Sequence, residues 1–211
     1  MHRLSLFMIA LVGCLSITGA TEFNCKRGTG FPKEVCYVPE CTNAIKDHIK
    51  YEFNAAFKYM YMGAYFGQDV VDRPGISKFL LEAASEERSH AIQMLDYLNL
   101  RGIKIDSTLG YSFDADTILE TSFTYQGALE EALNMEIEVT DLINNVVAKC
   151  ADDYHGADVF TNPILDEQHD GVRKLQGAVK ALHDLSAGYG TPAGLNLAEY
   201  LFDKKMMSGE F

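Results

Sequence analysis

Four long stretches of helical periodicity, joined in one place by a long segment that lacks it, constrain the fold of this chain more than any other feature. In each stretch apolar residues recur every three or four positions, so a helix would bury one face and leave the other in water. A long connection between two such helices is typical of a crossover along a bundle. We therefore predict an all-α fold, a four-helix bundle with a long crossover between helices two and three, plus a short fifth C-terminal helix. The helices are expected at 42–67, 74–101, 122–150, 157–186 and 195–204, and the crossover at 103–121.

Residues with strong positional preferences set the expected helix ends. Thr42 or Asn43 suits the N-cap of helix one, and Gly67 is expected to end that helix in the left-handed conformation. The segment 152–156 is expected to be a turn. Pro163 should kink helix four near 159–163, since proline removes an N–H donor and clashes with the preceding turn. The buried stripe of helix one is expected to include Ile45, Ile49, Phe53, Ala56, Phe57, Met60 and Ala64, and that of helix three Leu129, Leu133, Glu136, Ile137, Thr140, Ile143 and Val147.

The first 20 residues have the pattern of a secretory signal peptide. A basic start is followed by an apolar run from Leu4 to about Ile17 and by small residues up to Ala20, where we expect cleavage. The apolar run is too short to favour a membrane span. We therefore expect a signal peptide at 1–20, a cysteine-containing arm at 21–41 and one bundle domain at 42–211, in a protein that is secreted or lies in the secretory pathway.

Charge and cysteines restrict the environment and the partners. The net charge of −12 disfavours nucleic acid and anionic membranes as partners and suits a protein that attracts cations, although general solubility explains it equally well. One of the five cysteines, Cys14, leaves with the signal peptide. An even number then remains in an oxidising compartment, which favours disulfides with three pairings open. The remaining cysteines are Cys25, Cys36, Cys41 and Cys150.

Polar residues interrupt the apolar stripes of all four long helices. Glu87 and His90 are three apart in helix two, which places a carboxylate beside an imidazole on one helix face. Such a pair alone is equally typical of a solvated face, and each polar residue could instead face water or a buried ion-pair partner. Buried together, they would need a cation to offset their burial, and oxygen-rich ligands with an imidazole suit iron or manganese. The candidates are Glu52 and Tyr59 in helix one, Glu86, Glu87 and His90 in helix two, Glu136 in helix three and Gln168 in helix four.

Taken together, these motifs resemble the ferritin family, and within it the iron-oxidising heavy-type subunit of secreted insect ferritins. The resemblance covers about 42–204 and implies a ferritin-like fold. It is carried by Glu52 with Tyr59, by Glu86-Glu87-Arg88-Ser89-His90-Ala91, by Glu136, by Leu165-Asp166-Glu167-Gln168 and by Ala198-Glu199-Tyr200-Leu201-Phe202-Asp203-Lys204.

The resemblance implies a role for each residue. Glu52 and His90 would hold a first iron, Glu87 would bridge two irons, and Glu136 would hold the second iron with Gln168 nearby. Glu86 and Glu167 would serve as mobile or transit ligands, and Tyr59 would donate a hydrogen bond or an electron. Two irons per subunit would bind as substrate and transient cofactor. A neutral amide binds a hard cation weakly, so Gln168 should leave the second iron labile, as suits a substrate that moves on to a mineral.

The implied function is a ferroxidase subunit that oxidises Fe(II) with dioxygen and stores iron as a ferric oxide mineral. The family forms a 24-subunit shell, here homo- or hetero-oligomeric with a light-type chain. Asp158 matches an acid of the entry channel, whereas Thr161 replaces a second acid. Two alternatives are a non-oxidising, iron-sequestering shell subunit that relies on a partner chain, and a di-iron oxygenase with an organic substrate.

The bundle expected from this resemblance also bears on the cysteines. With a crossover between helices two and three, the start of helix one and the end of helix three lie at the same end. A Cys41–Cys150 disulfide is then geometrically feasible. Cys25 and Cys36 would tie the arm together or bridge to a partner subunit, and the pairing stays open.

Overall fold

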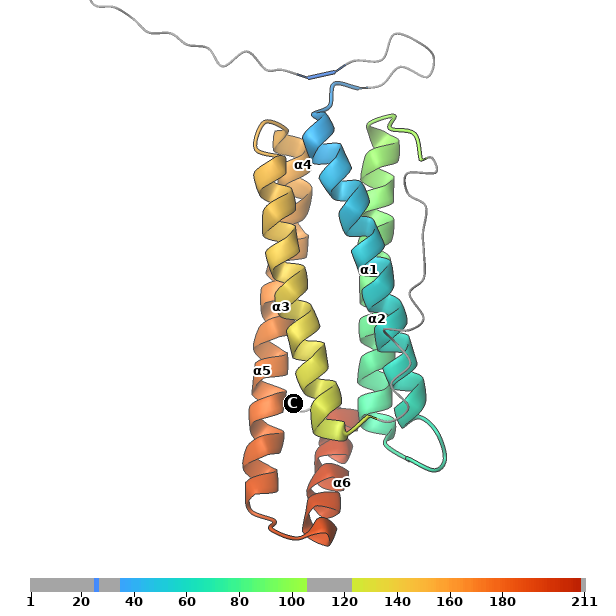
Figure 1. Cartoon of the computed structure of the whole chain (residues 1–211), viewed down its shortest axis with the longest axis vertical. Helices are drawn as coiled ribbons and strands as arrows, with labels where there is room; N and C mark the ends of the chain where they lie inside the picture. Colours follow the sequence, from blue (N-terminus) through green and yellow to red (C-terminus); the bar gives the residue numbers. More distant parts are fainter. Residues whose placement is uncertain (1–24, 27–34, 106–122, 210–211) are drawn as a thin grey trace, which may run out of the picture.

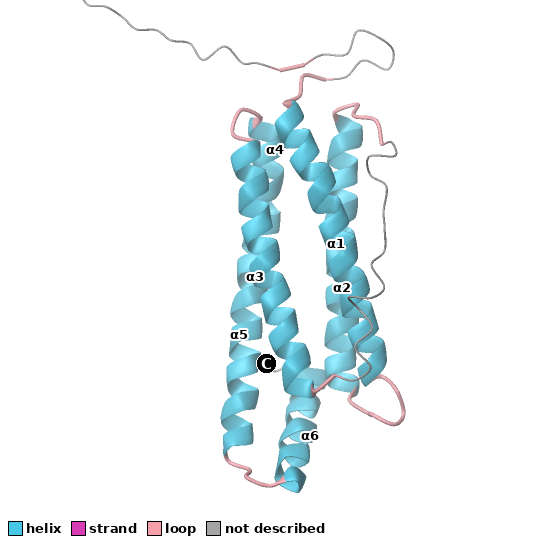
Figure 2. Cartoon of the chain, in the orientation of Figure 1, coloured by secondary structure: helices cyan, strands magenta, loops and turns pink. Residues whose placement is uncertain are grey.

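The computed structural model describes residues 25–26, 35–105 and 123–209 (Figure 1). The predicted signal peptide at 1–20, most of the arm at 21–41 and most of the crossover at 103–121 lie outside the described residues. Apart from one bridge between Lys26 and Tyr37, the regular structure of the described residues is helical (Figure 2). The elements are α1 (Pro39–Phe66), α2 (Pro74–Leu100), α3 (Tyr125–Lys149), α4 (Tyr154–Val159), the π-helical turn η2 (Phe160–Ile164), α5 (Leu165–Ala187) and α6 (Pro192–Ser208).

The four long helices form a bundle of two side-by-side pairs. Helix α1 packs along α2, α3 packs along α5, and α1 also contacts α3 across the centre (Figure 1). The chain leaves α2 at one end of the bundle and enters α3 at the other (Figure 1). Helix α6 packs on α2 and α5 at the end opposite α4. The predicted four-helix bundle with a crossover and a fifth helix is therefore confirmed.

Several predicted helix boundaries are wrong by a few residues. Helix α1 begins at Pro39 instead of 42, because proline at the first helical position loses nothing by lacking an N–H. Thr42 already lies inside the helix, where its hydroxyl donates to the carbonyl of Pro39 at 3.1 Å. Gly67 has a right-handed φ of −78°, so the predicted left-handed end is wrong. Among the described residues, the left-handed region is occupied instead by Gly102 after α2 and by Gly209 and Asp72.

The predicted kink in helix four is confirmed, but the helix begins earlier than expected. Asp153 caps α4 by accepting a hydrogen bond from the N–H of Gly156 at 3.1 Å, so the expected turn at 152–156 is already helical from Tyr154. Asn162 has non-helical φ and ψ just before Pro163, and η2 separates α4 from α5 there. Hydroxyl caps likewise set two other starts, Thr124 before α3 and Thr191 before α6.

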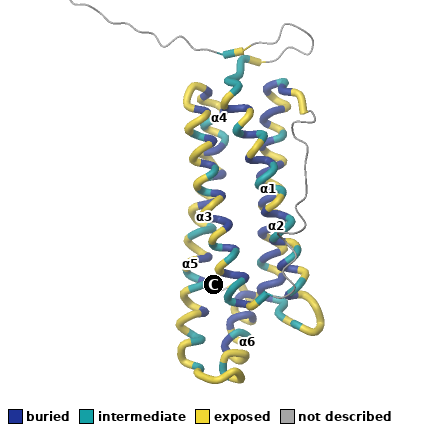
Figure 3. Tube along the Cα trace, in the orientation of Figure 1, coloured by how far each residue is buried: buried dark blue, intermediate teal, exposed yellow. Residues whose placement is uncertain are grey.

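Buried residues recur with the helical period along α1 and α3 (Figure 3), but three of the positions predicted to be buried are exposed. Along α1 the buried face passes from Ile45 and Ile49 through Glu52 and Tyr59 to Phe66. The predicted inward positions Met60 and Ala64 are exposed, and so is Ile137 on α3. With 3.6 residues per turn, a stripe extended in steps of four drifts out of the core, which explains these three errors.

Two disulfides and a buried ion pair tie one end of the bundle together. The pairs are Cys25–Cys36 and Cys41–Cys150, the second of which links the start of α1 to the residue after α3. The guanidinium of Arg101, at the end of α2, pairs with Asp153 at 2.8 Å. It also donates to the carbonyl of Cys36 in the arm. The Cys41–Cys150 pairing, which the expected bundle made feasible, is therefore present in the structure.

At the other end of the bundle, α6 caps α2. The carboxylate of Asp203 is buried and accepts hydrogen bonds from the N–H groups of Gly75 at 3.0 Å and Ile76 at 2.9 Å. These donors lie in the first turn of α2, which has no side-chain cap of its own. A Cβ atom on Gly75 would come within 2.1 Å of the Asp203 carbonyl oxygen, so glycine permits this close approach. None of the helices in the described ranges combines the length and the apolar character that crossing a bilayer requires.

Candidate metal centre

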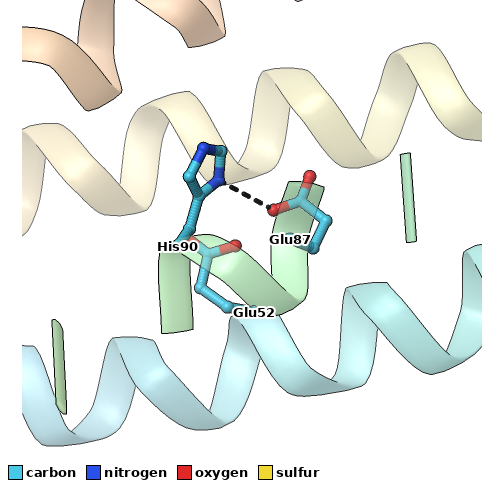
Figure 4. A group of neighbouring side chains, drawn as sticks. All are labelled: Glu52, Glu87 and His90. Atoms are coloured by element: carbon cyan, nitrogen blue, oxygen red, sulfur yellow. Dashed lines mark hydrogen bonds and ion pairs between the residues drawn. The ribbon is translucent and has the colours of Figure 1, made fainter. Parts of the chain in front are cut away.

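Glu52 from α1 and Glu87 and His90 from α2 converge in the interior of the bundle (Figure 4). One potential ligand atom from each residue lies within 4.8 Å of the other two. All three residues are buried, with exposed fractions of 0%, 3% and 7%. The Nδ1 atom of His90 lies 3.4 Å from a Glu87 carboxylate oxygen. This spacing matches the Glu-x-x-His expectation, because residues three apart on a helix share a face.

Three further predicted residues form a second buried group on the neighbouring helices. Tyr59 of α1 donates its hydroxyl proton to Glu136 of α3 at 2.5 Å. Gln168 of α5 donates its amide N–H to the carboxylate of Glu136 and also to its backbone carbonyl, at 3.2 Å. Glu136 and Gln168 are both buried. Two neutral donors therefore fix the Glu136 carboxylate on the α3 and α5 side of the core.

Glu87 links the two groups electrostatically. Burial, and after it the neighbouring Glu52, raises the pKa of Glu87 to about 8. Burial and then the charge of Glu87 raise the pKa of Glu136 to about 8. Glu87 thus interacts with Glu52 on one side and with Glu136 on the other, so its carboxylate could be shared by two cations.

His90 connects the buried cluster to the surface. Burial alone would lower its pKa, but the hydrogen bond and charge of Glu87 raise the pKa to about 9. Its Nε2 atom lies 3.3 Å from the carboxylate of Glu167, which is exposed on α5. The Nε2 atom thus faces Glu167, whereas the Nδ1 atom faces Glu87 in the cluster. Glu86 is exposed and does not belong to the cluster.

Among the described residues, imidazoles and not lysine or arginine side chains lie beside the carboxylates of this core. In the part of the chain that the structure describes, none of Glu52, Glu87 and Glu136 forms an ion pair with a lysine or arginine. Both carboxylate oxygens of Glu52 are buried without a hydrogen-bond partner there. Such groups are costly unless they are protonated or bind a cation. Carboxylate oxygens with one or two imidazoles form the donor set of a divalent iron or manganese site.

Sequence reasoning missed one residue beside the centre. His48 is buried one helical turn before Glu52, and its Nε2 atom lies 2.9 Å from a Glu52 carboxylate oxygen. Burial lowers the pKa of His48 to about 4, so its imidazole is neutral at physiological pH. The i, i+4 spacing of His48 and Glu52 on the buried stripe was the signal that could have identified it.

Comparisons with known proteins agree with this geometry. A family model described as a ferritin-like domain matches residues 42–184. The ferritin heavy chain of Trichoplusia ni is 37% identical over 179 residues, which make up 79% of this chain and 79% of that protein. The ferritin heavy chain of Drosophila melanogaster is 33% identical over 171 residues, covering 79% and 80% of the two proteins. The crystal structure of the secreted ferritin of Trichoplusia ni has a TM-score of 0.70 at 35% identity, and the match covers 81% of this chain and 90% of that chain.

These matches confirm the resemblance to secreted insect ferritins that the motifs predicted. The secreted neighbour and the two disulfides also confirm the expected localisation to the secretory pathway. The matched family model, the similarity to two heavy chains and the shared bundle all point the same way: this chain belongs to the ferritin family.

Proposed function

We propose that this ferritin subunit is an iron-storing ferroxidase, which oxidises Fe(II) to Fe(III) with dioxygen and passes the product to a ferric oxide mineral. One observation supports this most strongly. Glu52, Glu87 and His90 meet in the core beside Glu136, and no lysine or arginine of the described chain neutralises them. A passive shell subunit has no need for such a costly arrangement.

We assign the first iron to Glu52 and His90 and the second to Glu136, with Glu87 shared between them. The interactions of Glu87 with carboxylates on both sides support the shared role. Two ferrous ions held by one carboxylate can each give one electron to the same dioxygen molecule, which takes up two protons from solvent and leaves as hydrogen peroxide, so that no superoxide is released. The ligand residues contribute by holding both ions in a buried site, close enough together to react with the same dioxygen molecule.

Tyr59 and Gln168 act on the second iron through Glu136. Both donate to its carboxylate, which directs the remaining oxygen lone pairs toward Glu87 and the metal. Such outer hydrogen bonds orient a ligand and tune its basicity. The second position then has no imidazole and fewer protein ligands than the first, in keeping with an ion that leaves after oxidation. Glu167 contacts His90 at Nε2 and can orient its ring in the same way. The carboxylates of Glu86 and Glu167 are exposed and could bind iron as it leaves the centre.

Aerobic Fe(II) oxidation by the purified, assembled protein tests this function. The appearance of Fe(III) is followed by its ultraviolet absorbance at two irons per subunit, with the particle size recorded on the same sample. Replacing Glu87 and His90 by alanine should abolish rapid oxidation without changing the particle size. The matched control replaces His183 and Asp184, an exposed histidine–carboxylate pair on α5, by alanine. Equal rates for all three proteins would favour the non-oxidising, iron-sequestering subunit instead.

We further propose that the subunit assembles into the 24-subunit shell of its family, with or without a light-type chain. Apolar side chains exposed on the single chain support a contact role: Met60 and Leu81 on the α1–α2 side, and Leu195, Leu197 and Leu201 on α6. Native mass spectrometry of the secreted protein would give the subunit number and composition. A monomer, or a closed ring of a few subunits, would contradict this proposal.

We also propose that residues 1–20 are removed before assembly and that 21–41 and 42–211 form the arm and the bundle domain. The bundle starts at Pro39, so the arm–bundle boundary lies a few residues before 42. N-terminal sequencing of the secreted protein tests the cleavage. A mature chain that still begins at Met1 would refute it.

A further inference from the structure

We infer that His48 is a positioning residue of the candidate centre: its imidazole N–H holds the carboxylate of Glu52, so that Glu52 presents its oxygen to the iron in a fixed direction. The inference rests on the proposed function, because it concerns the iron that we assign to Glu52 and His90. His48 itself does not bind the metal, since it lies outside the group of ligand atoms that Glu52, Glu87 and His90 form.

The contact between His48 and Glu52 is short and enclosed. The Nε2 atom of His48 lies 2.9 Å from a carboxylate oxygen of Glu52, and the two side chains are 2% and 0% exposed. The residues are four apart on α1, so the helix itself places one side chain above the other. Because bulk water does not reach either side chain, the carboxylate is the acceptor that lies within reach of Nε2.

The chemistry of the pair sets the direction of the hydrogen bond. A metal-bound carboxylate is ionised and can only accept, so Nε2 must carry the proton of the neutral imidazole. Neither Nε2 nor the Glu52 oxygens have an aligned hydrogen bond among the described residues. Hydrogen bonds of a site are often poorly aligned before its ligand binds and tighten in the loaded site. We therefore expect the contact of 2.9 Å to become a hydrogen bond when Glu52 binds iron.

Aromatic side chains hold the ring of His48 in place. The ring of Tyr51 lies parallel to it, with an interplanar angle of 4° and a centroid distance of 6.3 Å. The edge of Phe160, from η2, approaches it at 5.9 Å and 67°. The imidazole thus has aromatic neighbours from α1 and from the kinked segment η2, and in a close-packed core these limit its rotation away from Glu52.

The role of His48 matches the arrangement on the other side of the core. There Glu136 accepts hydrogen bonds from Tyr59 and Gln168. With His48 behind Glu52, both carboxylates that we assign to a single iron have neutral donors behind them. A neutral donor orients a ligating carboxylate without cancelling the negative charge that attracts the metal, whereas a lysine or arginine in its place would compete with the metal.

Isothermal titration of the assembled protein with Zn(II), a redox-inactive probe, compares two substitutions of His48. H48L removes the N–H donor and leaves an apolar side chain, whereas H48Q keeps an N–H donor. Loss of an outer hydrogen bond to a ligand costs about 10- to 100-fold in metal affinity, so we expect this loss in H48L and an affinity within about threefold of the wild type in H48Q. The matched controls are H183L and H183Q, whose histidine is exposed on α5, and we expect both to bind zinc as the wild type does.

Binding at the centre is identified as the part of the titration that is missing when Glu87 and His90 are replaced by alanine. Equal affinities for H48L and the wild type would refute the inference. Equal losses in H48L and H48Q would also refute it, because the ring and not the N–H group would then matter. If the variant without Glu87 and His90 binds zinc as the wild type does, the proposed centre fails and the inference fails with it.

Anomalous diffraction from crystals of the wild-type protein soaked in Zn(II) gives a readout that does not depend on the folding of a variant. We expect zinc bonded to Glu52, with Nε2 of His48 at roughly 2.7–3.2 Å from a carboxylate oxygen of Glu52. Zinc bonded to Nε2 itself, or a zinc-bound Glu52 from which His48 has turned away, would overturn the inference and leave the proposed centre intact. The absence of zinc from the whole cluster would overturn both.

Discussion

Replacing Glu87 by glutamine should stabilise the metal-free protein and destabilise the metal-bound one. In the folded, metal-free chain, burial raises the pKa of Glu87 from 4.5 to about 8. At neutral pH the unfolded chain is therefore ionised at this residue while the folded chain is protonated. Folding must then take up a proton, which becomes harder as the pH rises. Glutamine has nearly the same shape and no proton to take up.

The size of this effect follows from the pKa shift. At pH 7 the cost corresponds to the roughly 2.5 pH units above the unfolded value, or about 3 kcal/mol at about 1.4 kcal/mol per unit. The cost vanishes below about pH 4.5 and reaches its full value above about pH 8. For a chain of this size, about 3 kcal/mol corresponds to an increase in Tm of about 6–12 °C.

The assay is thermal unfolding of metal-free, assembled protein at pH 5, 7 and 8.5, compared at equal subunit concentration. The matched control is Glu82→Gln on the same helix, where the carboxylate is exposed and pairs with Lys78. We expect the difference between Glu87→Gln and the wild type to grow with pH and that of the control to stay near zero.

Added Zn(II) should then reverse the order. A metal at about a thousand times its dissociation constant stabilises the wild type by about 4.1 kcal/mol, which exceeds the advantage of the metal-free variant if the variant, lacking the shared carboxylate, binds the metal only weakly. The reasoning is refuted if Glu87→Gln lowers the Tm of the metal-free protein at pH 7, or if its effect does not depend on pH.

Three further variants test other parts of the structure. Gln168→Glu should retain the second metal longer and slow iron oxidation after the first round, and unchanged multiple-turnover rates would contradict a labile second position. Asp203→Ala should lower the unfolding free energy by about 2–4 kcal/mol, measured by denaturant unfolding, because two buried N–H groups lose their acceptor; a loss no larger than that of the exposed control Asp184→Ala would show that the cap is unimportant. Replacing Cys41 and Cys150 together by serine opens a link that spans 109 residues and should cost about 4–5 kcal/mol, and an unchanged Tm would refute that estimate.

The helices were predictable because their periodicity is a local property of the sequence, whereas their ends were not. Helix α2 is capped by Asp203, which lies more than a hundred residues away, and no local pattern near Pro74 reveals that partner. Similarly, Asp153 both caps α4 and pairs with Arg101, so the start of α4 depends on a contact with α2. Boundaries set by tertiary contacts exceed what a single stretch of sequence can show.

The candidate centre was predictable to the extent that its proposed ligands interrupt apolar stripes. Glu52, Glu87, His90, Glu136 and Gln168 are all buried, as expected. Glu86 is exposed, because adjacent helical residues point about 100° apart and only one of the two glutamates can face the core. His48 was overlooked because its neighbours Ile45 and Ile49 already accounted for the stripe as apolar. The contact of its buried Nε2 atom with Glu52 becomes visible only in three dimensions.

The central claim is that side chains from separate helices hold two iron ions side by side. Mössbauer spectroscopy of protein loaded with two ⁵⁷Fe(II) per subunit, exposed to air and frozen within seconds, tests it most directly. We expect most of the iron to appear as magnetically coupled ferric pairs, and we expect these pairs to disappear when Glu87 and His90 are replaced by alanine. Isolated, uncoupled ferric ions in the wild type, or pairs that survive in the variant, would contradict it.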